Sequence, residues 1–251
     1  MMLPRYEVIG VTGIPEVRPG DDLGGLVVES ADRQGTPLRD GDLLVVGQKV
    51  VSKAEGRLVR LSDVSPSPAA ITMATQLGRD PRLVEVILRE SRRIVRMDRG
   101  VFIAETHHGW VCANAGVDQS NVEPDCVALL PEDPDRSARR LREAIRGAAG
   151  IDLAVIIADT FGRPWREGLT NVAIGVSGMA PLRSYLGYKD QAGRELQATI
   201  LAVADEVTGA AELVMGKLDR VPVAIVRGLR VAPGEEGSKP LLRDPARDLF
   251  R

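Results

Sequence analysis

The sequence is poor in the residues that bind soft metal ions, form disulfides or stack on aromatic ligands. It contains two cysteines, Cys112 and Cys126, and two adjacent histidines, His107 and His108, and its aromatic content is 3%. Two cysteines are too few for a disulfide framework, and with this pair of histidines they do not match the spacing of a zinc site. If a metal ion binds, we therefore expect a hard ion with oxygen ligands.

The sequence also lacks an excess of charge of one sign and any long apolar run. Its 33 basic and 35 acidic side chains give a formal net charge of -2, which argues against nucleic acid or an anionic membrane surface as a partner. No run approaches the ~20 apolar residues that cross a bilayer, and the opening MMLPRYEVIGV has no signal-peptide core. We expect a cytoplasmic protein.

What is present indicates a large mixed fold, because 251 residues with 44% apolar content can bury a substantial core. The apolar runs at residues 43–46, 151–158 and 221–226 predict buried strands, and residues 99–116 read as two strands that turn at His107 and His108. Helical spacing occurs in the ranges 67–78, 82–95 and 196–216, and a further helix is expected to begin near Ser137.

These elements alternate without the even rhythm of a doubly wound sheet, so the expected class is α+β or mixed α/β. The last stretch, residues 232–251, is rich in glycine, proline and charge. It is expected to be a tail that wraps around a unit formed by residues 1–231.

A polar segment, DTFGRPWREG at residues 159–168, follows directly on the buried run 151–158. A carboxylate at the edge of an apolar core, such as Asp159, needs a cation or hydrogen-bond donors to offset its desolvation. One interpretation pairs Asp159 with Arg163 or Arg166 and makes Thr160 a cap. The other places a divalent metal ion at Asp159 and uses the arginines to neutralise a phosphate. The segment alone is compatible with both.

A second segment, WVCANAGVDQSN at residues 110–121, also leads from an apolar strand to an isolated acid, Asp118, followed by Ser120 and Asn121. A turn in which Asp118 and Asn121 bond to nearby backbone explains the segment by itself. Two carboxylates that follow strands, each with oxygen-bearing neighbours, together favour a shared site for Mg²⁺ or Mn²⁺.

Two further segments carry charge in apolar surroundings. In VVSKAEGR, residues 50–57, a continued strand would place Lys53, Glu55 and Arg57 on one face. That face is either a solvated edge or a site where Lys53 binds a nucleotide phosphate and Arg57 binds an anionic substrate. In ADEVTGAAELVMGK, residues 204–217, Asp205 and Glu206 are adjacent in an apolar helix, and one of them is expected to point into a polar site.

The usual nucleotide-binding motifs are absent from the sequence. It contains no G-x-x-x-x-G-K-[ST] motif, and GIPEVRPGDDLGG is too irregular for a dinucleotide fingerprint. From the residues alone, two strand-end aspartates with nearby arginines are equally suited to a divalent-metal-dependent phosphoester hydrolase. A binding protein whose acids are all paired with arginine also remains open.

Four motifs in this order resemble those of the coenzyme F420-0:L-glutamate ligase family: QKVVSKAEGR, NAGVDQSN, ADTFGRPWREG followed by NVAIGVSG, and DEVTGAAELVMGK. The resemblance runs from about Val8 to Leu229 and implies a GTP-dependent ligase. Such an enzyme forms an acyl phosphate on F420-0, joins L-glutamate to it and extends a γ-linked tail. The resemblance also implies two divalent cations per site, Mn²⁺ or Mg²⁺, a K⁺ ion, and an intertwined homodimer of α+β protomers built from two interlocked parts.

The resemblance assigns roles to individual residues. Asp118 and Asp159 match the first metal's carboxylates, Thr160 matches a ligand of the second, and Lys53 with Arg163 or Arg166 would stabilise the transferring phosphoryl group. An archaeal-type member has an acidic residue at the position of Lys217, where it can serve the second metal, so here Glu206 or phosphate oxygens would substitute. The positions that match nucleotide contacts are Ile14, Pro15, Glu16, Val17, Gln48, Lys49, Lys53, Asn121, Gly216 and Lys217.

Overall fold

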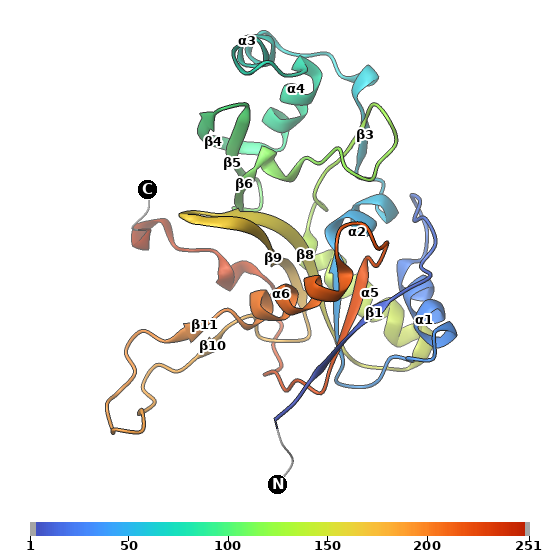
Figure 1. Cartoon of the computed structure of the whole chain (residues 1–251), viewed down its shortest axis with the longest axis vertical. Helices are drawn as coiled ribbons and strands as arrows, with labels where there is room; N and C mark the ends of the chain where they lie inside the picture. Colours follow the sequence, from blue (N-terminus) through green and yellow to red (C-terminus); the bar gives the residue numbers. More distant parts are fainter. Residues whose placement is uncertain (1–3, 249–251) are drawn as a thin grey trace.

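The structure is a computed structural model that describes residues 4–248, and its centre is a five-stranded mixed sheet (Figure 1). The strand order is β1-β12-β2-β8-β9. The pair β2 and β8 is parallel, whereas the other neighbouring pairs are antiparallel. The bounds of the strands are β1 (Glu7–Val11), β2 (Leu43–Gly47), β8 (Ala154–Arg163), β9 (Arg166–Ser177) and β12 (Val223–Arg227).

Helices cover both faces of this sheet, which explains why its strands read as continuous apolar runs. Along β2, Leu44 and Val46 belong to an apolar cluster with α1 and α5, whereas the alternate residues Leu43 and Val45 belong to a cluster with α6. Figure 1 shows α6 in front of the sheet and α5 behind it. The bounds of the helices are α1 (Leu23–Arg33), α2 (Gln48–Ala54), α5 (Pro134–Ala149) and α6 (Val203–Met215).

A second apolar core lies between α2 and α5 in the sequence and is centred on Phe102, Val84 and Ile87, all of them fully buried. Figure 1 places this part above the protruding ends of β8 and β9. It holds a three-stranded sheet, β4-β5-β6, and the pair β3-β7. Its elements are β3 (Leu58–Arg60), α3 (Pro68–Leu77), α4 (Pro81–Arg89), β4 (Ser91–Asp98), β5 (Val101–Thr106), β6 (Val111–Ala113) and β7 (Cys126–Ala128).

Two further segments complete the fold. The pair β10 (Arg183–Ser184) and β11 (Ile200–Leu201) forms the base of an arm, residues 183–201, that projects away from the sheet in Figure 1. After β12 the chain returns across the sheet, where the hydroxyl of buried Ser238 donates to the carbonyl of Ile174 at 2.9 Å. Within the described residues, no helix is long and apolar enough to cross a membrane.

The expected α+β class with mixed sheets is confirmed, as are the strands predicted at 43–46, 151–158 and 221–226. The turn at His107 and His108 and the helices α3 and α4 also agree with the sequence, although the second ends at Arg89 and the chain continues as β4. Arg92 and Arg93 explain this change, because both pair with the buried Glu105 on β5.

Two open interpretations of local structure are excluded, and two expectations about helix starts were wrong. The segment 159–168 is a β-hairpin that continues β8, so Thr160 caps nothing, and Lys53 lies on the helix α2 rather than on a strand. Helix α5 begins at Pro134 instead of near Ser137, because Asp133 accepts the N–H of Arg136 and proline is favoured in the first turn. Residues 196–202 are not helical, and α6 begins at Val203.

Candidate active site

Asp159 lies where β8 leaves the apolar core. The four residues before it are buried, and Asp159 itself is partly buried. One residue earlier the strand pairing slips, because Ile157 faces Gly175 whereas Ala158 faces Ala173, which leaves an extra residue in β9. Such a bulge redirects the side chains that follow it. Beyond the bulge, Thr160 pairs with Asn171.

Asp118 follows a turn in which three consecutive residues adopt left-handed backbone angles. The φ values are +53° at Asn114, +53° at Ala115 and +76° at Gly116. For a buried alanine this conformation costs about 1–2 kcal/mol. After the turn, Asp118 exchanges two backbone hydrogen bonds with Ala128 in β7, at 3.0 and 2.8 Å. The loop that carries Asp118 is therefore strained but firmly anchored.

The fold brings these two carboxylates into one electrostatic environment. Strand β6, which leads to Asp118, packs against β8, which carries Asp159. The charge of Asp118 raises the pKa of Asp159. Burial raises the pKa of Cys112 on β6 to about 12, and the charge of Asp159 contributes to that shift.

The surroundings of the two carboxylates are opposite in character. Burial acts to raise the pKa of Asp118, but hydrogen bonds from Lys49 and Ser120 outweigh it and lower the pKa. Lys49 Nζ lies 2.7 Å from Asp118 Oδ2, and the N–H of Ser120 lies 2.7 Å from Oδ1. For Asp159, burial raises the pKa to about 6, and the hydrogen bond from the N–H of Thr160 only partly offsets it.

Helix α2 begins directly at the end of β2 and supplies cations to the site. Gln48 is buried and accepts the hydroxyl of Ser52 at 2.9 Å, which fixes the first turn. One turn beyond Lys49, Lys53 forms an ion pair with Glu16 in the loop after β1. This ion pair joins two predicted nucleotide contacts, Lys53 and Glu16, that are distant in the sequence. A third predicted contact, Lys49, binds Asp118.

The remaining predicted nucleotide contacts lie on loops and differ in how exposed their side chains are. Val17 is buried and Ile14 packs against the main core, whereas Pro15 is exposed. Asn121 is exposed and has a positive φ of +54°. Gly216 ends α6 with φ +57°, and a Cβ there would lie 2.5 Å from Asp219 Oδ2, so this turn favours glycine.

Two residues that the sequence did not single out, Asn171 and Glu212, lie beside Thr160. The hydroxyl of Thr160 donates to Asn171 Oδ1 at 2.7 Å, and Asn171 Nδ2 donates to Glu212 Oε2 at 2.7 Å. Lys217 Nζ donates to the same hydroxyl at 2.5 Å. The sequence signals were that Glu212 belongs to the same motif as Glu206 and that Asn171 begins the motif NVAIGVSG.

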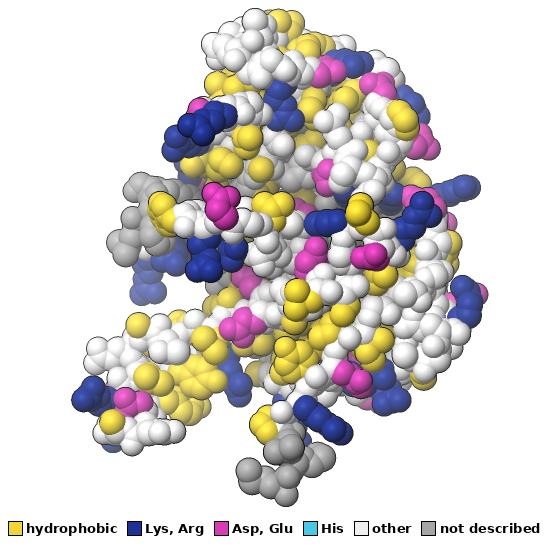
Figure 2. All heavy atoms as spheres, in the orientation of Figure 1, with side chains coloured by type: hydrophobic (Ala, Val, Ile, Leu, Met, Phe, Trp, Pro, Cys, Tyr) yellow, Lys and Arg dark blue, Asp and Glu magenta, His cyan; other side chains and the backbone are white. Residues whose placement is uncertain are grey.

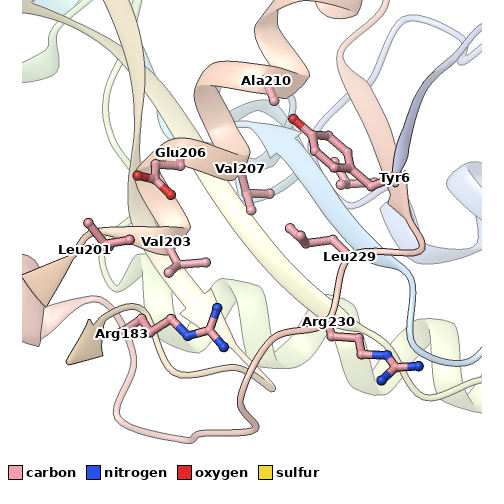
Figure 3. A pocket seen from close by; sticks show the side chains of 10 residues that line it. Tyr6, Arg183, Leu201, Val203, Glu206, Val207, Ala210, Leu229 and Arg230 are labelled. Atoms are coloured by element: carbon pink, nitrogen blue, oxygen red, sulfur yellow. The ribbon is translucent and has the colours of Figure 1, made fainter. Parts of the chain in front are cut away.

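Glu206 lines a separate cavity of about 160 Å³ with Tyr6, Arg183 and Arg230 (Figure 3). Glu206 is exposed, and the cavity is lined by residues of α6, of the base of the arm and of the segment after β12. Its neighbour Asp205 instead accepts the N–H of Ala173 at 2.9 Å. Glu212, and not Glu206, is the α6 carboxylate that joins the hydrogen bonds around Thr160.

Arg163 and Arg166 lie at the exposed tip of the β8–β9 hairpin. Arg163 is four residues beyond Asp159, about 13 Å along an extended strand, and its Nη2 donates to the carbonyl of Glu167 at 3.0 Å. Trp165 between them is 78% exposed and is not a core residue, whereas Trp110 is buried. Arg57 pairs with Glu90 at 2.9 Å, in the part that contains α4.

The donors at Asp118 and Asp159 fit one hard divalent cation. Asp159 has no ion pair among the described residues, although it is desolvated and lies near a second carboxylate. A cation between two such oxygens would offset both costs. No cluster of three histidine, cysteine, aspartate or glutamate side chains suited to a metal occurs in the described chain, so the remaining ligands would be water and substrate phosphate.

Comparison with known proteins identifies the family that the chain resembles. Residues 12–228 match the profile of the family described as F420-0:Gamma-glutamyl ligase. The chain belongs to this family. It is 49% identical over 254 residues to the coenzyme F420:L-glutamate ligase of Methanopyrus kandleri, covering 99% of both chains. It is 46% identical over 250 residues to that of Methanothermobacter thermautotrophicus, covering 97% of this chain and 98% of the relative.

Proposed function

We propose that this family member joins L-glutamate to coenzyme F420-0 in a GTP-dependent reaction and extends a γ-linked glutamate tail. The observation that carries the proposal is the shared environment of Asp118 and Asp159 in a chain 49% identical to an F420:L-glutamate ligase. Acids and lysines suit phosphoryl transfer, which needs positioning and charge neutralisation more than covalent catalysis.

The cofactor and nucleotide would be held by the residues already described. Asp118 and Asp159 would bind Mn²⁺ or Mg²⁺, which supplies charge neutralisation for the GTP phosphates. Lys49 and Lys53 lie on consecutive turns of α2, and each now pairs with a carboxylate, Asp118 or Glu16. Both ammonium groups would turn to the phosphates when the nucleotide binds. A K⁺ ion remains an expectation from the family.

The reaction has two steps. A carboxylate oxygen of the acceptor attacks the γ-phosphorus of GTP, the bond to the β-γ bridging oxygen breaks, and GDP leaves. The amine nitrogen of glutamate then attacks the carbonyl carbon of the acyl phosphate, phosphate leaves with the C–O bonding electrons, and the nitrogen releases a proton. A longer tail requires the same two steps at the γ-carboxylate of the last glutamate.

Arg163 and Arg166 would bind the anionic acceptor in this scheme. Both guanidinium groups are exposed beyond Asp159, and the Pro164-Trp165 turn presents them on either side. The acceptor carries the carboxylate that becomes the acyl phosphate, a group that arginine recognises well. Their position at the tip of the hairpin, about 13 Å along the strand from Asp159, suits the body of the acceptor better than the transferring phosphoryl group.

The test is mass analysis of the products after incubation with F420-0, L-glutamate, GTP and Mn²⁺. The proposal expects one or more added glutamyl units, with GDP and phosphate released only when both acceptor and glutamate are present. Phosphate release that is independent of glutamate would instead indicate a phosphoester hydrolase. Replacement of GTP by ATP in a parallel reaction measures the nucleotide preference.

We also propose that the enzyme is a homodimer in which the arm contacts the second copy. The arm exposes Leu186, Tyr188 and Ile200 by 46%, 65% and 47%, and Figure 2 shows hydrophobic side chains gathered along it. A two-stranded ribbon with an apolar surface is not stable alone in water. Sedimentation should show a dimer that dissociates in the double variant Leu186→Glu and Tyr188→Glu but persists in Ile71→Glu, which changes an exposed residue of α3. A monomeric parent enzyme would contradict the proposal.

A further inference from the structure

Four side chains beside Asp159 form a ring of three hydrogen bonds and one longer ion pair. Thr160 donates to Asn171 at 2.7 Å and Asn171 donates to Glu212 at 2.7 Å. Lys217 closes the ring, with its ammonium nitrogen 2.5 Å from Thr160 Oγ1 and 3.7 Å from Glu212 Oε1. The four residues come from β8, β9, α6 and the turn after α6, so the fold as a whole builds the ring.

Each member of the ring is fixed by its own element. Thr160 and Asn171 face one another across β8 and β9, and Asn171 is 4% exposed, so its amide has little freedom. The backbone carbonyl of Asn171 also accepts the hydroxyl of Thr208 from α6 at 3.1 Å. Gly216, with φ +57°, turns the chain after α6 and brings Lys217 back over β8.

The ring disfavours a second divalent ion at Thr160, because the hydroxyl already donates to Asn171 and accepts from Lys217. A hydroxyl has one hydrogen and two lone pairs. Here the hydrogen points to Asn171 and the ammonium of Lys217 occupies one lone pair. A Mg²⁺ ion at this oxygen would need a distance of about 2.1 Å, which would place two cations side by side on one neutral ligand. Glu212 is the single carboxylate in the ring, and it already accepts from Asn171.

We propose that Lys217 is a built-in cation, whose ammonium group takes the place of a second divalent metal beside Thr160. Each site then holds one Mn²⁺ or Mg²⁺, at Asp118 and Asp159. This inference rests on the proposed function, because it assumes that the site binds a metal with a guanine nucleotide. It differs from the expectation of two divalent ions that the family resemblance supplied.

The experiment measures bound Mn²⁺ directly. The dimeric enzyme is dialysed to equilibrium against Mn²⁺ with excess GDP, bound manganese is counted per chain, and its electron paramagnetic resonance spectrum is recorded. We expect one ion per chain with the spectrum of an isolated Mn²⁺. We expect two ions in Lys217→Glu, with the magnetic coupling of ions about 4 Å apart, because the new carboxylate joins Glu212 and Thr160 as a ligand.

A matched control and two contrary results define the test. Lys239→Glu makes the same charge change at an exposed residue of the C-terminal segment and should still bind one ion. Two coupled ions in the parent enzyme would overturn the proposal, and so would a single ion in Lys217→Glu. Lys217 is 62% exposed, so its replacement should not unfold the chain, and circular dichroism verifies this.

The outcome is separable from the proposed function, because dialysis needs neither F420-0 nor glutamate. Glutamylation by an enzyme that binds two ions would refute the built-in cation and leave the ligase proposal intact. One bound ion without glutamylation would support the built-in cation and refute the ligase proposal. The two proposals therefore fail on different measurements.

Discussion

Asp118 and Asp159 serve one site but reach it from regions of opposite character. Asp118 lies in a strained loop where Lys49 and Ser120 supply hydrogen bonds, and its pKa is lowered. Asp159 lies in β8 just beyond a bulge and forms no ion pair in the described chain, and burial raises its pKa to about 6 although the charges of Lys217 and Lys49 act to lower it. The loop side is organised without a ligand, whereas the strand side would be completed by the cation proposed above. A preformed site of this kind stores unfavourable electrostatic energy that binding can release.

The largest effect is expected from Asp159→Asn, which removes the unpaired charge and keeps the shape. Glutamylation should fall by at least about 100-fold, as expected for loss of a direct metal ligand, and Mn²⁺ binding should be lost. The melting temperature without metal should stay the same or rise, because an uncompensated carboxylate is removed from the core edge. Unchanged activity with the same metal requirement would show that Asp159 does not bind the metal.

Gly116→Ala tests whether the loop positions Asp118. A Cβ at Gly116 would lie 2.6 Å from buried Leu130, and the residue has φ +76°. We expect a loss of about 2 kcal/mol in unfolding free energy and weaker Mn²⁺ binding, measured by chemical denaturation and titration. Gly147→Ala in α5 is the control, because no atom lies within 4 Å of its Cβ and alanine favours a helix by up to about 1 kcal/mol. Equal stability of both variants would remove the argument for strain.

Lys49→Gln should have a smaller effect, because Ser120 still holds Asp118. Loss of the ammonium removes a cause that lowers the pKa of Asp118 and removes a cation expected to face the GTP phosphates. We expect KM for GTP to rise about tenfold, equivalent to about 1.4 kcal/mol, with a smaller change in kcat. A change confined to kcat would instead assign Lys49 to the transition state.

The sequence was sufficient for the elements buried on two faces. Strands β2, β8 and β12 read as apolar runs because helices cover both sides of the sheet. It was insufficient for the first half of β9, where residues 166–169 are exposed and show no alternation. Helix α2 was also missed, because it has seven residues and no side-chain cap.

Some residues of the candidate site were also predictable from the sequence, whereas others were not. Asp118 and Asp159 are recognisable because each acid follows an apolar strand. The ring of Thr160, Asn171, Glu212 and Lys217 depends on the register of β8 with β9 and on the turn at Gly216. Neither feature leaves a local pattern, so the hydrogen bonds that link Asn171 and Glu212 to Thr160 were found only from the structure, although both residues lie in the quoted motifs.

Asp205 is a third carboxylate with a shifted pKa, and it can be changed without altering Asp118 or Asp159. Burial raises the pKa of Asp205, and the hydrogen bond from the N–H of Ala173, next to the bulge in β9, only partly offsets this. Because the folded-state pKa lies above the unfolded one, protonated Asp205 favours the fold at low pH, and that contribution is lost as the pH rises through the folded value.

Asp205→Asn keeps an oxygen that can accept from Ala173 but cannot ionise. At pH 7 its melting temperature should exceed that of the parent by a few degrees, a shift of about 1 kcal/mol in a chain of this size, and the difference should vanish towards pH 3. The comparison uses thermal unfolding across this pH range, with Asp32→Asn, an exposed change in α1, as the control. A destabilised Asp205→Asn at neutral pH would mean that the charge of Asp205, like that of Asp159, is placed there to meet a cation.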